Sequence, residues 1–553
     1  MLGFPGSARG DQPWERRREA PLFADGGMVV AAHPLTTSAG LAVLEDGGNA
    51  VDAAVAAALV AAVVMPEMCG LGGDLFAIVS AKNNFVALHG SGIAPRSATI
   101  ELMRAHGDEG GKKMPYRGPL AAGVPGMVDG YFTLLERYGS KPFAELAERA
   151  IWYAGHGFPL TRDGAEYIAE SQSLLEQFPA SAAVFLPNST PPKSGNNLKQ
   201  EDLAKTLKNI ADKGVDAFYR GEIAKQIAEY MAANGGAMSC EDLADHRTNV
   251  STPIMTTYRD YTVYQTALPT QGLILLEALN LAERVDLAKI GPWSADGVHF
   301  LAEAKKIAYA DRLAYACDPA FGHVPLDQLL SKSWAAERFR EIDPNRAADD
   351  VRAGELQHGD TTYLCVVDRD GMMVSLIQSV SANFGCGVVV DGTGIVLNNR
   401  VGRGFSLEEG HPNLFAPGKK TMHTLNCYLI ADANDTPVLV GGTPGGDGQP
   451  QWNLQVISGL IDAGLDVQAA IEAPRWTSWP GTDPLSIDNP FELRVEDRLP
   501  EKTFEGLSTR GHVVKRIGPW DGGGSAQAIA RDPKTRVLAA GSDPRVEGCA
   551  AGF

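Results

Sequence analysis

The strongest constraint on the fold of this chain is a run of small apolar residues near its N-terminus. Ala53–Met65 contains only Ala, Val, Leu and Met. At about 13 residues, the run is shorter than the roughly 20 that a helix needs to cross a bilayer. Because its residues are apolar on every side, the sequence predicts a helix over Asn49–Val64 that the rest of the fold encloses. The turn Asp46–Gly48 separates it from a helix predicted over Ser38–Glu45.

Composition and charge narrow the class of protein. The chain has 553 residues, of which 44% are hydrophobic and 21% charged, as is ordinary for a soluble globular protein. This length allows three or four domains, or one large domain with long excursions. There are 67 Asp and Glu residues against 49 Lys and Arg, a formal charge of −18. Such an excess of negative charge argues against nucleic-acid and anionic-membrane partners.

The cysteines and the N-terminal residues indicate where the protein works. Seven cysteines include no Cys-x-x-Cys pair, which excludes a disulfide framework and the common zinc spacings. A reducing compartment follows from this sparse use of cysteine. The first residues carry charges but no apolar run of signal-peptide length. We therefore expect a cytoplasmic protein, unless an export signal has been removed.

The pattern along the chain divides it into segments of different character. Residues 1–27 are rich in Gly and Pro and are predicted to form a flexible arm. From about 142 to 340 the pattern is helical, except for strand-like alternation at Met255–Thr266. Ala335–Gly359 is polar and charged, as expected of an exposed linker. Other strands are predicted at Met28–Ala32, Leu75–Ser80, Thr361–Val367, Met373–Val380, Ile395–Asn398, Leu425–Ala431 and Pro437–Gly441, and two late helices at Gln451–Ala463 and Val467–Ala473.

Thr361 stands where the linker ends and a strand begins. A Thr hydroxyl in mid-chain is a poor nucleophile. If the Asp360–Thr361 bond is broken, however, Thr361 gains an α-amine with a reference pKa of about 7.7–8.0. That amine can accept the proton of the residue's own hydroxyl, so that nucleophile and base arrive together. The alternative is that Thr361-Thr362 merely opens a strand, as β-branched residues often do.

A glycine-rich loop, Gly441–Pro450, precedes the first of the late helices. Consecutive glycines allow successive N–H groups to point at one spot, an arrangement that suits the oxyanion of an acyl-transfer transition state. The Gly-Lys-Ser/Thr ending of a phosphate-binding loop is missing. A tight strand-to-helix connection is the structural alternative.

Taken together, these stretches resemble the γ-glutamyltranspeptidase family of N-terminal-nucleophile hydrolases over nearly the whole chain. The motifs that carry the resemblance are Gly47–Ala54, Cys69–Asp74, Gly123–Gly126, Gly359–Thr362, Leu397–Asn399 and Thr443–Gly446. The resemblance implies an α+β fold, a four-layer αββα sandwich with a helical excursion in the large-subunit segment. It also implies a precursor that cuts itself between Asp360 and Thr361 into a large-subunit segment, 28–360 with its arm, and a small-subunit segment, 361–553. Both segments would form one sandwich, and no metal or organic cofactor is expected.

The resemblance also assigns roles to individual residues. Thr361 falls on the nucleophile, Ser379 on a hydroxyl residue that supports it, and Gly445 and Gly446 on the oxyanion-hole glycines. The machinery of acyl transfer is therefore expected to be intact.

The substrate-recognition positions depart from the family pattern. Ser91 stands where transpeptidases use an Arg for the glutamyl carboxylate, and Arg403 replaces the Asp that binds the α-amino group. An Arg there places like charge against an ammonium, which excludes glutamyl donors unless the pocket is rebuilt. We hypothesise that Arg400 and Arg403 bind a carboxylate or another electron-rich oxygen of a different acyl group, the alternative being two surface arginines. The full set of predicted substrate-binding residues is Ser381, Arg400, Arg403, Thr421 and His423.

These residues favour the acylase branch of the family, which includes cephalosporin acylases and oxamate amidohydrolase. The predicted function is that of a self-processing amidohydrolase acting on a small non-glutamyl amide, with the two fragments of one precursor as partners and a homodimer of these left open. One rival is a γ-glutamyl hydrolase or transpeptidase with a rebuilt pocket. The other is an inactive family member that acts as a binding protein.

Overall fold

The computed structural model describes residues 1–4, 14–18, 20–82, 84–349, 360–481 and 490–553, the side chain of Asp360 excepted. Two seven-stranded sheets dominate it, and every strand pair within them is antiparallel. The first sheet has the order β21 (Cys549–Gly552), β2 (Gly27–Ala31), β10 (Asp360–Asp368), β11 (Met373–Ser381), β3 (Asp74–Ala81), β4 (Asn84–Gly90) and β7 (Asn249–Ser251). The second has the order β1 (Leu22–Ala24), β20 (Leu538–Ser542), β19 (Gln527–Arg531), β15 (Pro437–Gly442), β14 (Tyr428–Ala431), β9 (Tyr261–Gln265) and β8 (Ile254–Tyr258).

The two sheets share one apolar cluster. Phe76 and Tyr363 of the first sheet meet Leu429 and Val440 of the second, and all four are buried. Contacts of β10 with β19 and of β11 with β15 join the sheets face to face, as in other packed sheet pairs. The strands predicted at Thr361–Val367 and Met373–Val380 are confirmed as β10 and β11, which pair as a hairpin in the middle of the first sheet.

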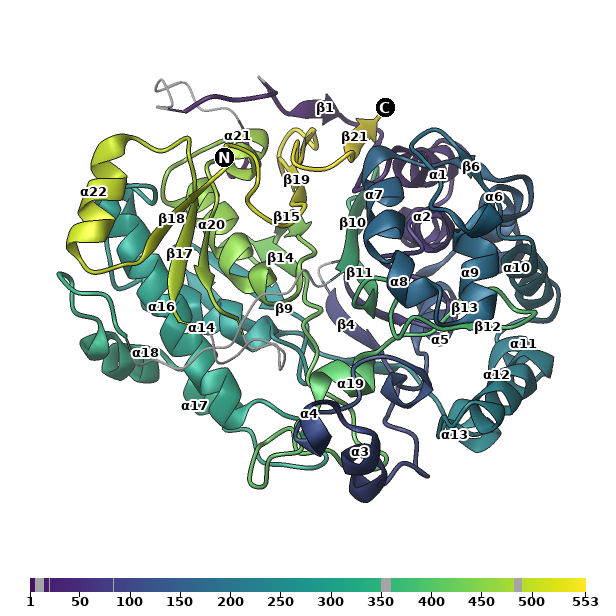
Figure 1. The fold of residues 1–553 in the computed structure, drawn as a ribbon. Helices are drawn as coiled ribbons and strands as arrows, with labels where there is room; N and C mark the ends of the chain where they lie inside the picture. Colours follow the sequence, from purple (N-terminus) through teal and green to yellow (C-terminus); the bar gives the residue numbers. More distant parts are fainter. Residues whose placement is uncertain (5–13, 19, 83, 350–359, 482–489) are drawn as a thin grey trace.

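Helices cover the outer faces of both sheets (Figure 1). On the first sheet, α1 (Pro34–Glu45) and α2 (Ala50–Val64) pack beside β2, β10 and β11. On the second, α14 (Gly272–Ala282), α16 (Ala295–Tyr315), α20 (Gln449–Ile461) and α21 (Val467–Glu472) form the matching cover. In the described part of the chain, the two sheets therefore face each other, and helices cover the outer face of each sheet.

The apolar run that opened the sequence argument is α2, and all of its residues are buried. Asn49 caps it by accepting the N–H groups of Val51 and Asp52, while Asp52 accepts the N–H of Asn49. Such a capping box contributes about 1 kcal/mol. Helices α1, α5 (Met127–Tyr138) and α6 (Phe143–His156) surround α2 on the sides that do not face the sheet.

The remaining elements form excursions from the two sheets. Between β4 and β8 lie α3 (Ile100–His106), α4 (Asp108–Gly111), α7 (Arg162–Glu170), α8 (Gln172–Leu175), α9 (Pro179–Phe185), α10 (Glu201–Lys213), α11 (Asp216–Tyr219), α12 (Glu222–Ala233) and α13 (Cys240–Ala244), with the short pair β5 (Phe158–Pro159) and β6 (Asn197–Leu198). Later come α15 (Leu287–Ile290), α17 (Leu326–Leu329), α18 (Lys332–Arg338), β12 (Val389–Val390), β13 (Ile395–Val396), α19 (Arg400–Gly404), β16 (Trp476–Trp479), β17 (Glu492–Glu496), α22 (Glu501–Thr509) and β18 (Val514–Ile517). No helix in the described ranges is both long and apolar enough to cross a membrane.

Three sequence predictions need correction. The expected arm is structured in part, because β1 pairs with β20 and the main-chain N–H groups of Arg17 and Arg18 bond to Glu472. The expected linker begins too early, since Ala335 is buried within α18 against α14 and α16; residues 350–359 lie outside the described part.

The third correction concerns β14, which starts at Tyr428 instead of Leu425. The side chain of Gln449 binds both nitrogens of Asn426, and this takes the preceding residues out of the strand ladder.

Candidate active site

Thr361 lies at a β-bulge in the central hairpin. Asp360 and Thr362 of β10 pair with Ser381 and Gln378 of β11, so one residue on β10 faces two on β11. The extra residue re-aims the side chains next to it, as bulges beside active sites often do. Ser381, which closes the bulge, has a φ of +89° although it is not glycine.

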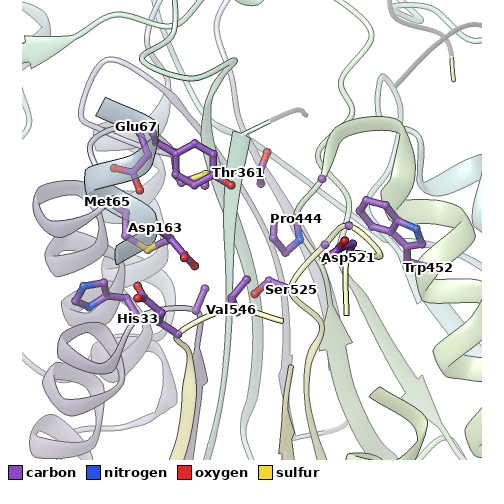
Figure 2. Close-up of a pocket in the computed structure, with 18 of the residues that line it drawn as sticks. His33, Met65, Glu67, Asp163, Thr361, Pro444, Trp452, Asp521, Ser525 and Val546 are labelled. Carbon is purple, nitrogen blue, oxygen red and sulfur yellow. The ribbon is translucent and has the colours of Figure 1, made fainter. Parts of the chain in front are cut away.

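The bulge brings two hydroxyl groups together. Thr361 Oγ1 donates to Ser379 Oγ at 3.2 Å, and the backbone N–H of Ser381 donates to the same oxygen at 2.7 Å. Ser379 is thereby fixed against the hydroxyl of Thr361, the supporting position that the resemblance implied. Thr361 is 3% exposed and lines a cavity of about 260 Å³ (Figure 2).

The glycine-rich loop reaches the same cavity. Gly445 lines it beside Pro444 and has a φ of +120°; the φ of Gly446 is +53°. Among the described residues, neither glycine N–H donates a hydrogen bond to a protein group. Gln271 Nε2 holds the carbonyl of Gly446 at 2.7 Å, and Arg312 holds the following Asp447 at 2.5 Å. The loop is thus anchored on both sides while its two amides stay available for an oxyanion.

The cavity at Thr361 is acidic, and we call it the acidic cavity. Its lining includes four carboxylate residues and one cation: Glu67, Asp163, Asp521, Glu547 and Arg494. Burial raises the pKa of Glu67 to about 8, and the negative charges of Asp163 and Glu547 contribute a smaller part of this rise. His33 also lines the cavity, and burial lowers its pKa to about 4, so it is neutral at pH 7.

A second cavity, of about 300 Å³, has the opposite character, and we call it the basic cavity. Its charged lining residues are Lys112, Lys113, Arg312, Arg400, Arg403, Glu408 and Asp447. Arg400 is 3% exposed and Arg403 is 7% exposed, so the alternative of two surface arginines is wrong. The structure places both on the short helix α19, directly after Asn398-Asn399.

The two arginines have different partners. Arg400 Nε donates to Asp74 at 2.9 Å, and its Nη2 is buried with no hydrogen-bond partner within the described ranges. Arg403 Nη1 donates to the carbonyl oxygen of Ser381 at 2.9 Å. Because the N–H of Ser381 binds Ser379, a continuous chain of contacts links the basic cavity to Thr361.

The other predicted substrate-binding residues do not line either cavity. Thr421 Oγ1 donates to the carbonyl of Met422, and Ser381 Oγ is buried with no hydrogen-bond partner in the part of the chain that the structure describes. His423 is fully buried, with Nε2 2.5 Å from Ser91 Oγ and its ring against Phe76. Burial lowers the pKa of His423 well below its usual value, so it is a neutral group of the interior. The side chain of Asp360, the other half of the predicted cleavage site, lies outside the described part.

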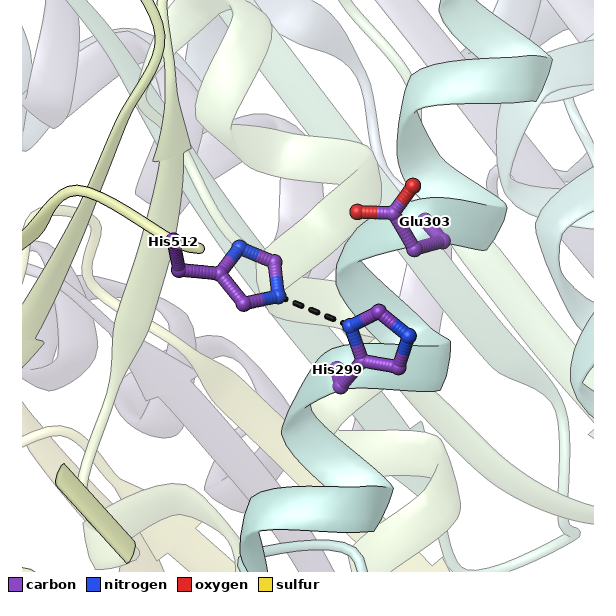
Figure 3. A group of neighbouring side chains, drawn as sticks. All are labelled: His299, Glu303 and His512. Carbon is purple, nitrogen blue, oxygen red and sulfur yellow. Dashed lines mark hydrogen bonds between the residues drawn. The ribbon is translucent and has the colours of Figure 1, made fainter. Parts of the chain in front are cut away.

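One group of described side chains has the residue types and spacing of a metal site: His299, Glu303 and His512 (Figure 3). The protein already satisfies these atoms. His299 Nδ1 is 2.8 Å from His512 Nε2, its Nε2 is 2.8 Å from the carbonyl of Asp343, and Glu303 pairs with Lys306 at 2.8 Å. The group joins α16 to the loop after α22 and is absent from the lining of both cavities. We therefore interpret it as a structural hydrogen-bond network.

Sequence reasoning missed the acidic wall and the partner of Arg400. Glu67 and Asp163 lie outside the quoted motifs, and Glu547 is 186 residues from Thr361 in the sequence. Asp74 was part of a quoted motif but carried no assigned role. Its burial opposite a buried Arg is visible only once β3 and α19 are placed side by side.

Comparisons with known proteins agree with this geometry. The model of the gamma-glutamyltranspeptidase family matches residues 36–553. The chain belongs to this family, whose members act on amide bonds.

Individual relatives span almost the full length. The glutathione hydrolase-like YwrD proenzyme of Bacillus subtilis is 38% identical, with 95% of this chain and 98% of the relative covered. The oxamate amidohydrolase proenzyme of Klebsiella pneumoniae is 37% identical, with the same shares covered. The crystal structure of a cephalosporin acylase from Bacillus halodurans superposes with a TM-score of 0.90 at 36% identity, covering 99% of both chains.

Proposed function

We propose that this protein is a self-processing amidohydrolase that cleaves a small amide whose acyl part carries a negative charge. The observation that carries the proposal is the position of Thr361. Its hydroxyl is bonded to Ser379 at a bulge, and it shares a cavity with Gly445, whose N–H is available. The names of relatives, which include acylases and an amidohydrolase, support the same reaction class.

Maturation precedes turnover in this proposal. Thr361 Oγ1 attacks the carbonyl carbon of Asp360, the C–N bond breaks, and the nitrogen becomes the α-amine of Thr361. Water then hydrolyses the resulting ester. The products are the segments 1–360 and 361–553, in keeping with the proenzyme names of the relatives.

In turnover, the new α-amine takes the proton of Thr361 Oγ1 as the oxygen attacks the substrate carbonyl. The N–H groups of Gly445 and Gly446 stabilise the oxyanion. The protonated amine then gives its proton to the leaving nitrogen, and water hydrolyses the acyl ester. Ser379 is a positioning residue, since its oxygen holds the hydroxyl of Thr361 in the cavity.

The basic cavity supports an anionic acyl part. Arg400 and Arg403 are buried there, and no described residue accepts a hydrogen bond from the Nη2 of Arg400. A carboxylate can satisfy a guanidinium through two parallel hydrogen bonds. We interpret the run of helices, sheet, sheet and helices as the four-layer αββα sandwich. Because all seven cysteines are free thiols, we assign the protein to the cytoplasm.

A γ-glutamyl substrate is the second candidate, and the names of several relatives as glutathione hydrolases favour it. Arg403 opposes it, because a desolvated arginine repels the α-ammonium of a glutamyl group. Assay of γ-glutamyl-p-nitroanilide beside glutaryl-p-nitroanilide separates the two, since only the former carries that ammonium. We expect turnover of the glutaryl compound; preference for the glutamyl compound would reverse the assignment.

A further inference from the structure

We propose that the acidic cavity is the subsite for the amine part of the substrate, and that it selects amines carrying a positive charge beside an apolar, ring-shaped body. This inference rests on the proposed function, because it takes Thr361 as the attacking group. It adds the chemical class of the leaving amine.

The first argument is the unpartnered carboxylate. Glu67 is 3% exposed and lines the cavity, and its Oε2 is buried without a hydrogen-bond partner among the residues that the structure describes. A buried acceptor that is left without a hydrogen bond costs about 1–3 kcal/mol of stability, and more if the group is charged. A cationic or N–H-bearing ligand satisfies that oxygen, so the site gains from binding such a group.

The second argument is that the neighbouring charges have the same sign. Asp163 on α7 and Glu547 before β21 line the same wall, and Glu67 and Asp163 lie on the same side of Thr361 (Figure 2). Arg162 pairs with Asp163 at 2.8 Å, but Arg162 itself is exposed. Arg494, the cation in the lining, pairs with Glu492 at 3.1 Å. The cavity therefore keeps an excess of negative charge toward any ligand.

The third argument is the aromatic wall opposite. Trp452 lies across the cavity from Glu67 (Figure 2), and its Nε1 donates to Thr477 at 2.9 Å. Four glycines surround its ring so closely that an added Cβ would come within 2.1–2.6 Å of it: Gly445, Gly448, Gly523 and Gly524. Only glycine fits these positions, so the indole is held rigidly. Trp479 also lines the cavity, and the guanidinium of Arg494 lies over its ring, 3.7 Å from the ring centroid. Indole faces attract cations by about 0.5–2 kcal/mol.

Charge then fixes the direction of the substrate. An anionic acyl part is repelled by the carboxylates of the acidic cavity and attracted by the arginines of the basic one. The loop that carries Gly445 and Asp447 contributes Gly445 to the first cavity and Asp447 to the second. With the acyl part in the basic cavity, the amine part extends from Thr361 into the acidic one.

The test uses the uncut Thr361→Ala chain, which needs no substrate. Binding of benzyltrimethylammonium, benzyl alcohol and benzoate is measured at pH 9 by calorimetry and by tryptophan fluorescence. We expect the cation to bind at least tenfold more tightly than the alcohol, and benzoate to bind least tightly in the cavity. Glu67→Gln and Asp163→Asn should each weaken the cation by threefold or more. The matched control, Glu408→Gln in the basic cavity, should leave its affinity unchanged.

Equal affinities for the cation and the alcohol, or a Glu67→Gln effect no larger than that of Glu408→Gln, would overturn the inference. Because Glu67→Gln and Asp163→Asn are measured separately, a folding defect in one variant still leaves the other as a test. The proposed function fails separately, if wild-type protein turns over no anionic amide or if Thr361→Ala retains full turnover. If the enzyme is active but its acidic cavity binds the cation and the alcohol equally, only the inference about the amine subsite is rejected.

Discussion

The two cavities are similar in size and opposite in charge. The acidic one, of about 260 Å³, has four carboxylates against one cation; the basic one, of about 300 Å³, has five cations against two carboxylates. Thr361 lines the former, while Arg400 and Arg403 line the latter. In the function that we propose, this difference in charge orients the amide, with its acyl part toward the arginines and its amine part toward the carboxylates.

The two cavities also differ in how their charges are compensated. In the basic cavity, Arg400 faces Asp74 at 2.9 Å and Arg312 faces Asp447 at 2.5 Å. In the acidic cavity, Glu67 Oε2 has no hydrogen-bond partner in the described part of the chain, and burial raises the pKa of Glu67. These two arginines of the basic cavity are therefore compensated by neighbouring carboxylates, whereas the acidic cavity becomes more negative as Glu67 ionises.

The largest expected effect comes from a substitution in the glycine-rich loop, which lines both cavities. Gly445→Ala places a Cβ 2.1 Å from the ring of Trp452 at a residue whose φ is +120°. We expect kcat for amide hydrolysis to fall by about 10²–10³-fold, the typical cost of losing an oxyanion donor. Gly464→Ala is the matched control, because that glycine has a φ of +64° and nothing within 4 Å of its added Cβ. If both variants lose activity equally, backbone strain alone explains the result and the oxyanion role is wrong.

The next effect tests the basic pole. Arg403→Ala should lower kcat/KM for glutaryl-p-nitroanilide at least about tenfold, since a buried charge contact to the acyl group is lost. Lys113→Ala is the control, because Lys113 lines the same cavity but already pairs with Glu109. Steady-state kinetics of both variants decide the point. An unchanged kcat/KM in Arg403→Ala would remove this residue from substrate binding.

A smaller effect sharpens the acidic pole. Since burial raises the pKa of Glu67 to about 8, its carboxylate is neutral below that pH and negative above it. Affinity for benzyltrimethylammonium, whose charge does not titrate, should rise severalfold as pH increases through about 8. His33, which lines the same cavity, is already neutral in this pH range, because burial lowers its pKa to about 4. The Glu67→Gln profile should be flat; an identical rise in that variant would assign the titration to another group.

The smallest effect lies outside both cavities and tests how the free energy of unfolding depends on acid pH. Burial lowers the pKa of His512 from 6.5 to about 3, so the folded state binds fewer protons than the unfolded one between these values. Its contribution to stability is complete above pH 6.5 and is lost as pH falls toward 3, by about 1.4 kcal/mol per pH unit. His512→Gln should therefore reduce the pH dependence of the unfolding free energy by about one proton. Urea unfolding at pH 7, 6 and 5 measures it, and an unchanged slope would contradict the burial argument.

Much of the fold was predictable because its signals are local. The apolar run of α2, the hairpin of β10 and β11, and the helix after the glycine loop each follow from residues close together in the sequence. The bulge at Thr361 was not predictable, because it depends on the register between Asp360 and Ser381. Sequence also missed β1, whose three residues become a strand only because the edge of β20 is there to pair with them.

The candidate site divides in the same way. Thr361, Gly445 and the two arginines carry motif signals, and each of them lines one of the two cavities. Glu67 and Trp452 carry none, since a carboxylate in the loop after α2 and an indole in α20 acquire meaning only when the fold places them on opposite walls of one cavity. Conversely, His423 was among the predicted substrate-binding residues, but the packing of Phe76 and Ser91 encloses it.

The central claim is that breaking the Asp360–Thr361 bond creates the catalytic group. Mass spectrometry and N-terminal sequencing of the denatured active protein test this most directly. We expect two polypeptides, the smaller one beginning with Thr361 and holding 553 − 360 = 193 residues, and a single uncut chain for Thr361→Ala. A protein that hydrolyses its amide while every molecule remains one chain of 58.8 kDa would contradict it.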